Sequence, residues 1–343
     1  MAVFHGPGKA PMARCPRFWS ALAFFLIAPA CVLSSCSAAA AEAPEPAAVA
    51  AIPDAEEVAL ETSDGLSLAA WYYPVSEDAA PLATVILVHD LDGSHKSVEP
   101  LALALQKLGC AVVAPDLRGH GASTIRTTAN GREETLDPKT FKKSDLEMIA
   151  AATGGRVRDQ SGIRGDIEAV RNFVKQKSDA GELDIDRLCV VGSGAGATLA
   201  ALWTVADWAW PPIASGPQGQ QVRALVLISP IWATKGLSIS PALSADVLKR
   251  QMPIMVLAGK DDRDATRLAE QLKKQRPKEW FEQRPGQQPA KAKELEKVAD
   301  ATVFFMQADS TLSGDKLAAD RSANPADRVK TFLSLVLDKN KKR

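Results

Sequence analysis

From residue 57 onward, short apolar runs alternate with segments whose apolar residues recur every three or four positions. Continuous apolar runs are typical of strands that are buried on both faces, and the wider spacing is typical of the helices that cover them. This alternation predicts an α/β fold with one mostly parallel sheet of about eight strands and helices on both faces. The predicted strands are 58–62, 66–72, 84–88, 110–114, 188–191, 222–228, 253–258 and 302–306. The predicted helices are 98–108, 163–177, 195–206, 265–274 and 326–337.

The first 36 residues predict a targeting segment that does not belong to the fold. Three basic residues (Lys9, Arg14 and Arg17) precede an apolar stretch over 18–33, and small residues follow it. The stretch is short for a membrane span and is interrupted by Pro29. We therefore expect residues 1–36 to act as a signal peptide.

The end of this segment indicates how the chain is attached. Leu33-Ser34-Ser35-Cys36 resembles a bacterial lipobox, in which the cysteine is lipidated and becomes the new N-terminus. We expect a lipoprotein of the bacterial envelope, outside the cytoplasm, that is held to the membrane through Cys36. Ser37 favours the outer membrane, by analogy with bacterial lipoproteins retained at the inner membrane by an aspartate there. Cleavage within 38–41, which would release a secreted or periplasmic protein, and an uncleaved anchor are the alternatives.

The predicted domain begins after a linker. Residues 37–55 are mostly alanine, proline, glutamate and valine, which is typical of an extended tether, and 56–343 form the folded domain. Its two cysteines, Cys110 and Cys189, lie near the start of two predicted strands that flank a common neighbour. Their separation of roughly 10 Å, at a strand spacing of about 4.8 Å, exceeds the reach of a disulfide. We expect two free, buried thiols.

Composition and motifs exclude several functions. The chain has 41 basic and 41 acidic residues, so its formal net charge is zero and nothing indicates a nucleic-acid partner. No histidine, cysteine and aspartate spacing is typical of a zinc site, and no glycine-rich phosphate loop follows the first strand. We expect no metal and no cofactor.

A turn over 192–196 follows the apolar strand 188–191. Its sequence, Gly-Ser-Gly-Ala-Gly, has the frame Gly-x-Ser-x-Gly of a nucleophile elbow, but Gly194 occupies the position of the attacking serine. Ser193 stands one place too early, and its side chain should point away from the crevice because side chains alternate along a strand.

Several motifs in order resemble the α/β-hydrolase superfamily, in particular its monoacylglycerol-lipase and serine-aminopeptidase-like branch. Leu87-Val88-His89-Asp90 stands where that family has a His-Gly pair. Residues 116–123 (Asp-Leu-Arg-Gly-His-Gly-Ala-Ser) match its Asp-x-Arg-Gly-His-Gly-x-Ser. The elbow follows, and then residues 259–262, in which Asp262 takes the position of the catalytic acid. The resemblance covers most of residues 57–340 and implies the α/β-hydrolase fold.

The resemblance also implies a catalytic triad, and this chain departs from it twice. The attacking serine is replaced by Gly194, and the loop 307–312, where the family has its histidine base, contains no histidine. A hydroxyl without a base is a poor nucleophile. Asp262 is then interpreted as a turn residue or as the cap of the helix that follows.

Three earlier histidines are possible substitutes for the base. His89 and His120 are interpreted as hydrogen-bonding residues that shape the crevice floor, or as accessory residues of a non-standard site. We expect His95, which precedes Lys96, to be solvated.

A binding crevice can remain without the triad. The backbone N–H groups of Leu91 and Ala195 are expected to converge and to attract a carbonyl or an anion. Two insertions, 122–162 and 207–221, are expected beside this edge of the sheet. The tryptophans near the second insertion either line a groove or pack the insertion onto the helix after the elbow; they are Trp203, Trp208, Trp210 and Trp232.

Two functional hypotheses remain. The first is a non-catalytic, envelope-anchored protein with the α/β-hydrolase fold that binds a small molecule or an envelope protein. The second is a serine hydrolase, esterase-like or peptidase-like, that uses Ser193 with His120 or His89.

Overall fold

The computed structural model of this protein describes residues 52–76, 80–151, 165–210, 219–286 and 298–340. The chain divides into two compact units, Met1–Ala48 and Val49–Arg343, and every described residue belongs to the second. The predicted signal peptide, with its lipobox at Cys36, and the tether as far as residue 51 lie outside the described residues.

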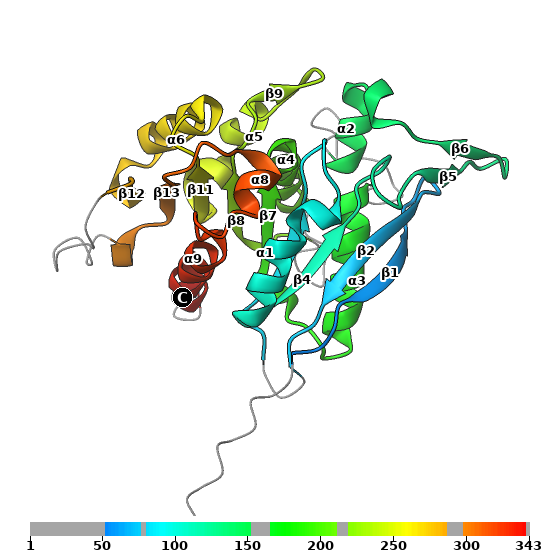
Figure 1. Cartoon of the computed structure of the whole chain (residues 1–343), viewed down its shortest axis with the longest axis horizontal. Helices are drawn as coiled ribbons and strands as arrows, with labels where there is room; N and C mark the ends of the chain where they lie inside the picture. Colours follow the sequence, from blue (N-terminus) through cyan, green and yellow to red (C-terminus); the bar gives the residue numbers. More distant parts are fainter. Residues whose placement is uncertain (1–51, 77–79, 152–164, 211–218, 287–297, 341–343) are drawn as a thin grey trace, which may run out of the picture. The chain divides into compact units, whose positions relative to one another are not determined.

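The second unit is built on a nine-stranded sheet with the strand order β1-β2-β4-β3-β7-β8-β11-β13-β12 (Figure 1). β1 and β2 form an antiparallel hairpin, β2 runs antiparallel to β4, and all later neighbours are parallel. The strands are β1 Glu56–Glu61, β2 Ser67–Tyr73, β3 Ala83–Val88, β4 Cys110–Pro115, β7 Leu188–Ser193, β8 Val222–Ile228, β11 Ile254–Ala258, β12 Trp280–Gln283 and β13 Val303–Gln307.

Helices cover both faces of the sheet, and short hairpins extend from its loops. The helices are α1 His95–Lys107, α2 Lys143–Ile149, α3 Asp166–Asp179, α4 Ala195–Trp208, α5 Ser240–Ser244, α6 Arg263–Gln275, α8 Gly314–Ala318 and α9 Pro325–Asn340. The two hairpins pair β5 Ile125–Thr127 with β6 Glu133–Thr135, and β9 Ala233–Thr234 with β10 Leu237–Ser238.

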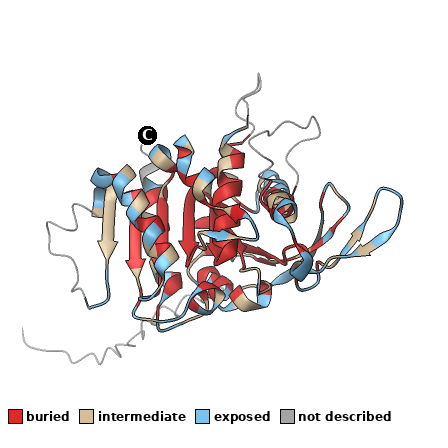
Figure 2. Cartoon of the chain, turned by 90° about the horizontal axis from the view of Figure 1, so that it is seen from above, coloured by how far each residue is buried: buried red, intermediate tan, exposed pale blue. Residues whose placement is uncertain are grey.

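The sheet separates two apolar cores, and its central strands are almost wholly buried (Figure 2). One core lies between the sheet and the helices α2 to α6, and the other lies between the sheet and α1, α8 and α9. Every residue of β3, β4, β7 and β11 is buried. The continuous apolar runs of the sequence therefore reflect burial on both faces.

The α/β-hydrolase fold is confirmed, and each strand and helix expected from the sequence is present with small shifts at its ends. The expected number of strands, about eight, was one too low because β12 was missed. β12 is an edge strand whose four residues are all half-buried, so it has neither a continuous apolar run nor a clear alternation.

The two cysteines of this unit are free and buried, as expected. Cys110 lies on β4 and Cys189 on β7, and both strands pair with β3 on opposite sides. Burial raises the pKa of the Cys110 thiol to about 11 and raises that of Cys189 further.

The placement expected for the second insertion was wrong. Residues 207–221 connect the C-terminal end of α4 to the start of β8. Because α4 runs antiparallel to the strands, the described ends of this connection, 207–210 and 219–221, lie at the amino edge of the sheet, away from the elbow. The insertion over 122–162 does follow the carboxyl end of β4, and its described part forms the β5–β6 hairpin and α2.

Candidate functional site

The elbow has the geometry that its sequence predicts. β7 ends at Ser193, α4 begins at Ala195, and Gly194 joins them with φ +57° and ψ −125°. This backbone conformation is costly for a residue with a side chain. The strand-turn-helix scaffold is therefore present, and its apex carries no reactive atom.

The two amide donors beside the elbow do converge, but the chain itself occupies them. Asp90 Oδ1 accepts hydrogen bonds from Leu91 N at 2.8 Å and from Ala195 N at 2.9 Å. Bonds from amides to an ionised carboxylate are stronger than bonds between neutral groups. Burial raises the pKa of Asp90 above its usual value, and the two amide donors oppose this effect.

The Asp90 carboxyl group fills the space above the elbow between two glycines. A Cβ atom added at Gly194 would lie 1.9 Å from Asp90 Oδ2 and 2.1 Å from its Cγ. A Cβ atom at Gly314, whose φ is +55°, would lie 2.7 Å from the same Oδ2. A side chain at position 194 is therefore incompatible with the present position of Asp90.

Ser193 is buried beneath the elbow and bonded to a second aspartate. Its Oγ donates to Asp315 Oδ1 at 2.5 Å. Asp315 Oδ1 also accepts a hydrogen bond from Asp90 N at 2.9 Å. The other carboxylate oxygen of Asp315 accepts from Ser97 Oγ at 2.5 Å. Asp315 thus fixes the elbow, the loop after β3 and the start of α1 to one another, and Ser193 lines neither cavity beside the elbow.

His89 and His120 are both held by the loops around them. His89 Nε2 accepts from Leu117 N at 3.0 Å, and its Nδ1 donates to Asp90 O at 2.6 Å. Burial lowers the pKa of His89 to about 4. The ring nitrogens of His120 face Arg118 O at 2.8 Å and Leu91 O at 2.6 Å. No histidine among the described residues is a hydrogen-bonding partner of Ser193, and the crevice-floor interpretation fits both rings.

The expectation that His95 is solvated was wrong. The side chain is buried, its ring stacks on Trp71 at 3.2 Å between centroids, and its Nδ1 lies 2.9 Å from Asp116 Oδ1. His95 is the first residue of α1, and its own backbone N–H also donates to Asp116. The neighbouring Lys96 suggested a surface position, but the sheet places Trp71 and Asp116 around the ring.

Asp262 caps α6, as the sequence interpretation proposed. Its Oδ1 accepts from Ala265 N at 3.0 Å. Its Oδ2 is buried and has no hydrogen-bonding partner among the described residues. Burial raises the pKa of Asp262 above its usual value.

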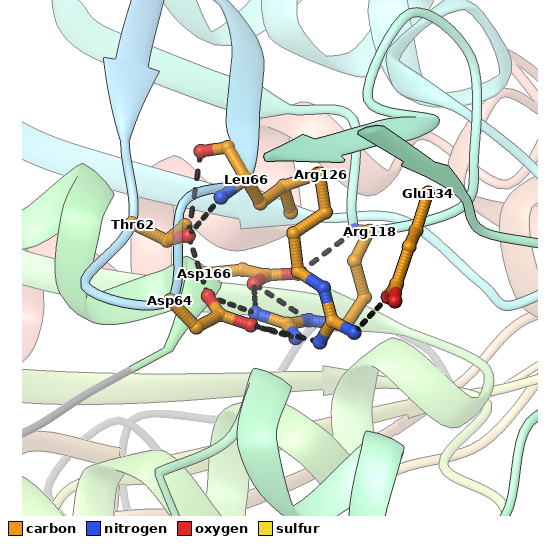
Figure 3. Close-up of polar contacts among 7 residues, drawn as sticks. All are labelled: Thr62, Asp64, Leu66, Arg118, Arg126, Glu134 and Asp166. Carbon is orange, nitrogen blue, oxygen red and sulfur yellow. Dashed lines mark hydrogen bonds and ion pairs between the residues drawn. The ribbon is translucent and has the colours of Figure 1, made fainter. Parts of the chain in front are cut away.

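Arg118, from the Asp-x-Arg-Gly-His-Gly motif, belongs to an ion-pair network at the end of the β1–β2 hairpin (Figure 3). Its guanidinium bonds to Asp166 Oδ1 through Nε at 2.9 Å and Nη2 at 2.6 Å, and to Asp64 Oδ2 through Nη1 at 3.0 Å. Arg126 lies 3.6 Å from Asp64 and 2.5 Å from Glu134. The network connects the hairpin turn, the loop after β4, the β5–β6 hairpin and the start of α3.

Two cavities border the elbow, and Asp90 lines both. The first, of ≈ 500 Å³, lies among the loop after β3, the Arg-Gly-His-Gly loop and residues 137–141. The second, of ≈ 360 Å³, lies among Gly194, Ser229, the start of α6 and the loop 311–314. Volumes of this size are typical of small-molecule sites.

The four tryptophans line neither cavity. Trp203 is fully buried, Trp208 Nε1 donates to Val222 O at 3.1 Å, and Arg267 lies 3.7 Å above the ring of Trp232. Trp203 is thus a core residue, Trp208 is bonded to the start of β8 and lines a separate cavity there, and Trp232 contacts α6. Among the described residues, no group of three or more metal-ligating side chains is placed to hold an ion.

Sequence reasoning missed Asp90, Asp315 and Ser229. Asp90 did carry a signal, because a carboxylate stands where the resemblance implies a glycine, directly before the donor Leu91. Asp315 and Ser229 carried none, since their neighbours at the site come from distant parts of the chain.

Comparisons with known proteins agree with this architecture. A profile described as "Alpha/beta hydrolase family" matches residues 85–337. Two uncharacterised proteins of Mycobacterium tuberculosis, from strains CDC 1551 / Oshkosh and H37Rv, are each 33% identical over 88 residues, which cover 26% of this chain and 31% of theirs. The chain therefore matches about a third of the length of these relatives.

Solved structures show the same fold at low identity. An esterase of Pyrococcus furiosus has a TM-score of 0.51 at 15% identity, over 82% of this chain and 91% of that one. An esterase of Pyrobaculum calidifontis has a TM-score of 0.51 at 14% identity, over 83% and 86%. The hydrolase GrgF from Penicillium sp. sh18 has a TM-score of 0.51 at 11% identity, over 83% and 100%.

Proposed function

This chain belongs to the alpha/beta hydrolase family, and we propose that it has kept the family's fold without its hydrolytic chemistry. The proposal is a non-catalytic protein that binds a small molecule or an envelope protein at the crevice beside its elbow. It is held outside the cytoplasm by a lipid on Cys36.

The observation that carries this proposal is the position of Asp90. The carboxylate accepts from Leu91 N and Ala195 N, the two donors that would stabilise a developing oxyanion. An acyl substrate has to displace a negative charge held by two hydrogen bonds before its carbonyl oxygen reaches these donors. The amide pair is thus unavailable for acyl transfer.

The described residues around the elbow provide neither a nucleophile nor a base, which supports the same proposal. Gly194 has no reactive atom, Ser193 donates to a buried carboxylate, and His89 uses both ring nitrogens within its loop. Serine attack requires a base within hydrogen-bonding reach of the hydroxyl. The likeness to esterases concerns the fold alone and does not supply these missing parts.

Two cavities on either flank of the elbow support a binding role. They open at the carboxyl edge of the strands, where α/β proteins bind ligands. The envelope location rests on the sequence around Cys36. No helix in the part of the chain that the structure describes combines the length and the apolar character that a membrane crossing requires.

Catalysis is tested with a fluorophosphonate probe and with p-nitrophenyl acetate and butyrate. We expect no labelling and no hydrolysis above that of Ser193→Ala, while an esterase with an intact triad, run in parallel, reacts in both assays. Labelling that disappears in Ser193→Ala would overturn the proposal in favour of a serine hydrolase.

The anchor is tested separately by metabolic labelling with a palmitate analogue in a bacterial host. We expect label and membrane fractionation for the wild-type chain, and loss of both in Cys36→Ala. An unlabelled wild-type chain in the soluble envelope fraction would instead indicate cleavage within 38–41.

A further inference from the structure

The smaller of the two cavities carries an excess of negative charge. Four aspartates and one arginine line it, namely Asp90, Asp261, Asp262, Asp264 and Arg263. Arg263 and Asp261 are exposed at the opening, whereas Asp90, Asp262 and Asp264 are half-buried. The interior of the cavity is therefore acidic.

Within the described parts of the chain, three of these carboxylates accept hydrogen bonds from backbone amides through one oxygen only. Asp90 Oδ1 accepts from Leu91 N and Ala195 N, Asp262 Oδ1 from Ala265 N, and Asp264 Oδ2 from Trp232 N at 2.9 Å. Backbone donors fix the orientation of each group, and the second oxygen is left for another partner. Asp262 Oδ2 is buried without such a partner.

A neutral group at the end of β8 points to the same space. Ser229 is 4% exposed, lines the cavity, and its Oγ has no partner in hydrogen-bonding geometry among the described residues. The hydroxyl lies close enough to Asp262 to lower the pKa of its carboxyl group, against the larger effect of burial. The backbone of Ser229 has φ +47°, a strained conformation for a residue with a side chain. Ser229 Oγ and Asp262 Oδ2 are thus buried neighbours, and neither has a partner in full hydrogen-bonding geometry among the described residues, so a ligand with several donors can satisfy both.

The chemistry of the lining selects the ligand class. No described group of three or more aspartate, glutamate, histidine or cysteine side chains converges closely enough for a metal ion. An ammonium group has three donors around one charge and suits a carboxylate beside a hydroxyl. Pro230, Ile231 and Leu312 add an apolar part to the wall, which suits a short alkyl chain.

We propose that this cavity binds a small organic ammonium ion, with the ammonium group donating to Asp262 Oδ2 and Ser229 Oγ and the alkyl chain lying against Pro230, Ile231 and Leu312. The inference rests on the binding role proposed above and specifies its ligand class. The carboxylate of Asp90 contributes attraction from the elbow side.

The test uses n-butylammonium as the probe, with 1-butanol as the neutral isostere and butyrate as the anion, in a saturation-transfer NMR titration of the purified protein. We expect n-butylammonium to bind at least tenfold more tightly than 1-butanol, and butyrate not to compete. Equal binding of the cation and the alcohol, or preferential binding of butyrate, overturns the proposal.

Variants locate the site. Asp262→Asn removes the charge and keeps a side chain that caps helices, so we expect a folded protein whose Kd for n-butylammonium rises at least tenfold. Ser229→Gly removes the hydroxyl, relieves the positive φ, and should raise the Kd a few-fold. Asp309→Asn is the matched control, since Asp309 is exposed nearby but does not line the cavity. An unchanged Kd in both Asp262→Asn and Ser229→Gly overturns the proposal.

The result is separable from the test of catalysis. A protein that hydrolyses esters and also binds n-butylammonium refutes the non-catalytic proposal and leaves the cation site intact. A protein that does neither refutes the cation site alone.

Discussion

At the scale of single residues, Asp90 and Gly194 form a sterically matched pair. The carboxyl group of Asp90 occupies the volume that a side chain at position 194 requires, and only glycine leaves that volume open. The same carboxylate satisfies two backbone donors that would otherwise face the crevice. The two residues are therefore expected to respond to substitution together.

Substitution at this pair gives the first prediction. Gly194→Ser adds backbone strain of about 1–3 kcal/mol and a steric clash of about 1–3 kcal/mol. We expect Asp90→Gly to remove the clash, so that the double variant is at least about 1 kcal/mol more stable than the sum of the single effects. Denaturant unfolding of the four proteins measures this coupling, and additive effects would show that the side chains do not compete for space.

A control substitution at another glycine separates the cost of backbone strain from the cost of the steric clash with Asp90. Gly181 also has a positive φ, +82°, but nothing lies within 4 Å of an added Cβ atom. Gly181→Ser should cost the strain alone and show no coupling to Asp90→Gly. We further expect no ester hydrolysis in the double variant, since a serine at 194 still has no base.

The residues at the site also show where sequence reasoning ends. The role of Asp262 as a helix cap was predictable because the cap and its amide partner lie three residues apart. The environment of His95 was not, because Trp71 on β2 and Asp116 after β4 are distant from it in the sequence. The pairing of Asp90 with Ala195 likewise joins residues that are distant along the chain.

At the scale of elements, the buried guanidinium of Arg118 connects its own loop after β4 to two segments that are distant in the sequence, the hairpin turn at Asp64 and the start of α3 at Asp166. The Arg118 side chain is 4% exposed, and its partner Asp166 is fully buried at the start of α3. A buried carboxylate that loses its cationic partner is strongly destabilising. The hairpin turn and α3 are thus held together by charge as well as by the apolar core.

The second prediction concerns this network. Arg118→Met should lower the free energy of unfolding by about 3–5 kcal/mol, because Asp166 is left charged and buried. Arg126→Met is the control, since its side chain is 31% exposed and such pairs contribute about 0–1 kcal/mol. Urea unfolding followed by circular dichroism compares the two, and losses of equal size would contradict a special role for Arg118.

The third prediction concerns Glu168 on α3. Burial raises its pKa from 4.5 to about 7, and the ion pair with Arg171 opposes the shift. The folded state binds this proton more tightly than the unfolded state. The resulting stabilisation of the folded state is fully present below pH 4.5 and is lost as the pH rises through 7. The free energy of unfolding should fall by about 3 kcal/mol over that window, at 1.4 kcal/mol per pH unit.

Unfolding at pH 5, 6, 7 and 8 tests this dependence. Buried carboxyl groups whose pKa shifts have other causes, such as Asp90 and Asp262, contribute equally to the wild type and the variant. The side chain in Glu168→Gln cannot ionise. The free energy of unfolding of this variant should therefore fall less between pH 5 and pH 8 than that of the wild type. Parallel profiles for the two proteins would place the responsible group elsewhere.

Elements were more predictable than contacts. A buried parallel strand has to be apolar throughout, so β3, β4 and β7 were predictable from continuous apolar runs in the sequence. β12 and the β5–β6 hairpin did not, because their exposed or half-buried residues follow neither pattern.

At the scale of the whole folded unit, stability depends on two apolar cores separated by the sheet, and no covalent link crosses it among the described residues. The two thiols lie on strands separated by β3, and burial raises both pKa values. The location expected for the protein favours disulfides in general, but this geometry does not permit one between Cys110 and Cys189.

The fourth prediction follows from this arrangement. Dithiothreitol should leave the Tm unchanged to within about 1 °C, whereas losing a disulfide of typical strength would lower it by several degrees. Iodoacetamide should modify Cys110 and Cys189 only in denaturant, because both are buried. Rapid modification of the native protein, followed by mass spectrometry, would contradict the placement of either thiol.

The carboxylate of Asp90 has a further consequence when it is considered as a tethered ligand. A group attached one residue from its binding site is present at an effective concentration far above that of any dissolved competitor. Free carboxylates at millimolar levels should therefore fail to reach the Leu91 and Ala195 amides in the wild type. The Asp90 carboxylate therefore acts as an intramolecular competitor for any anion that could bind to these two amides.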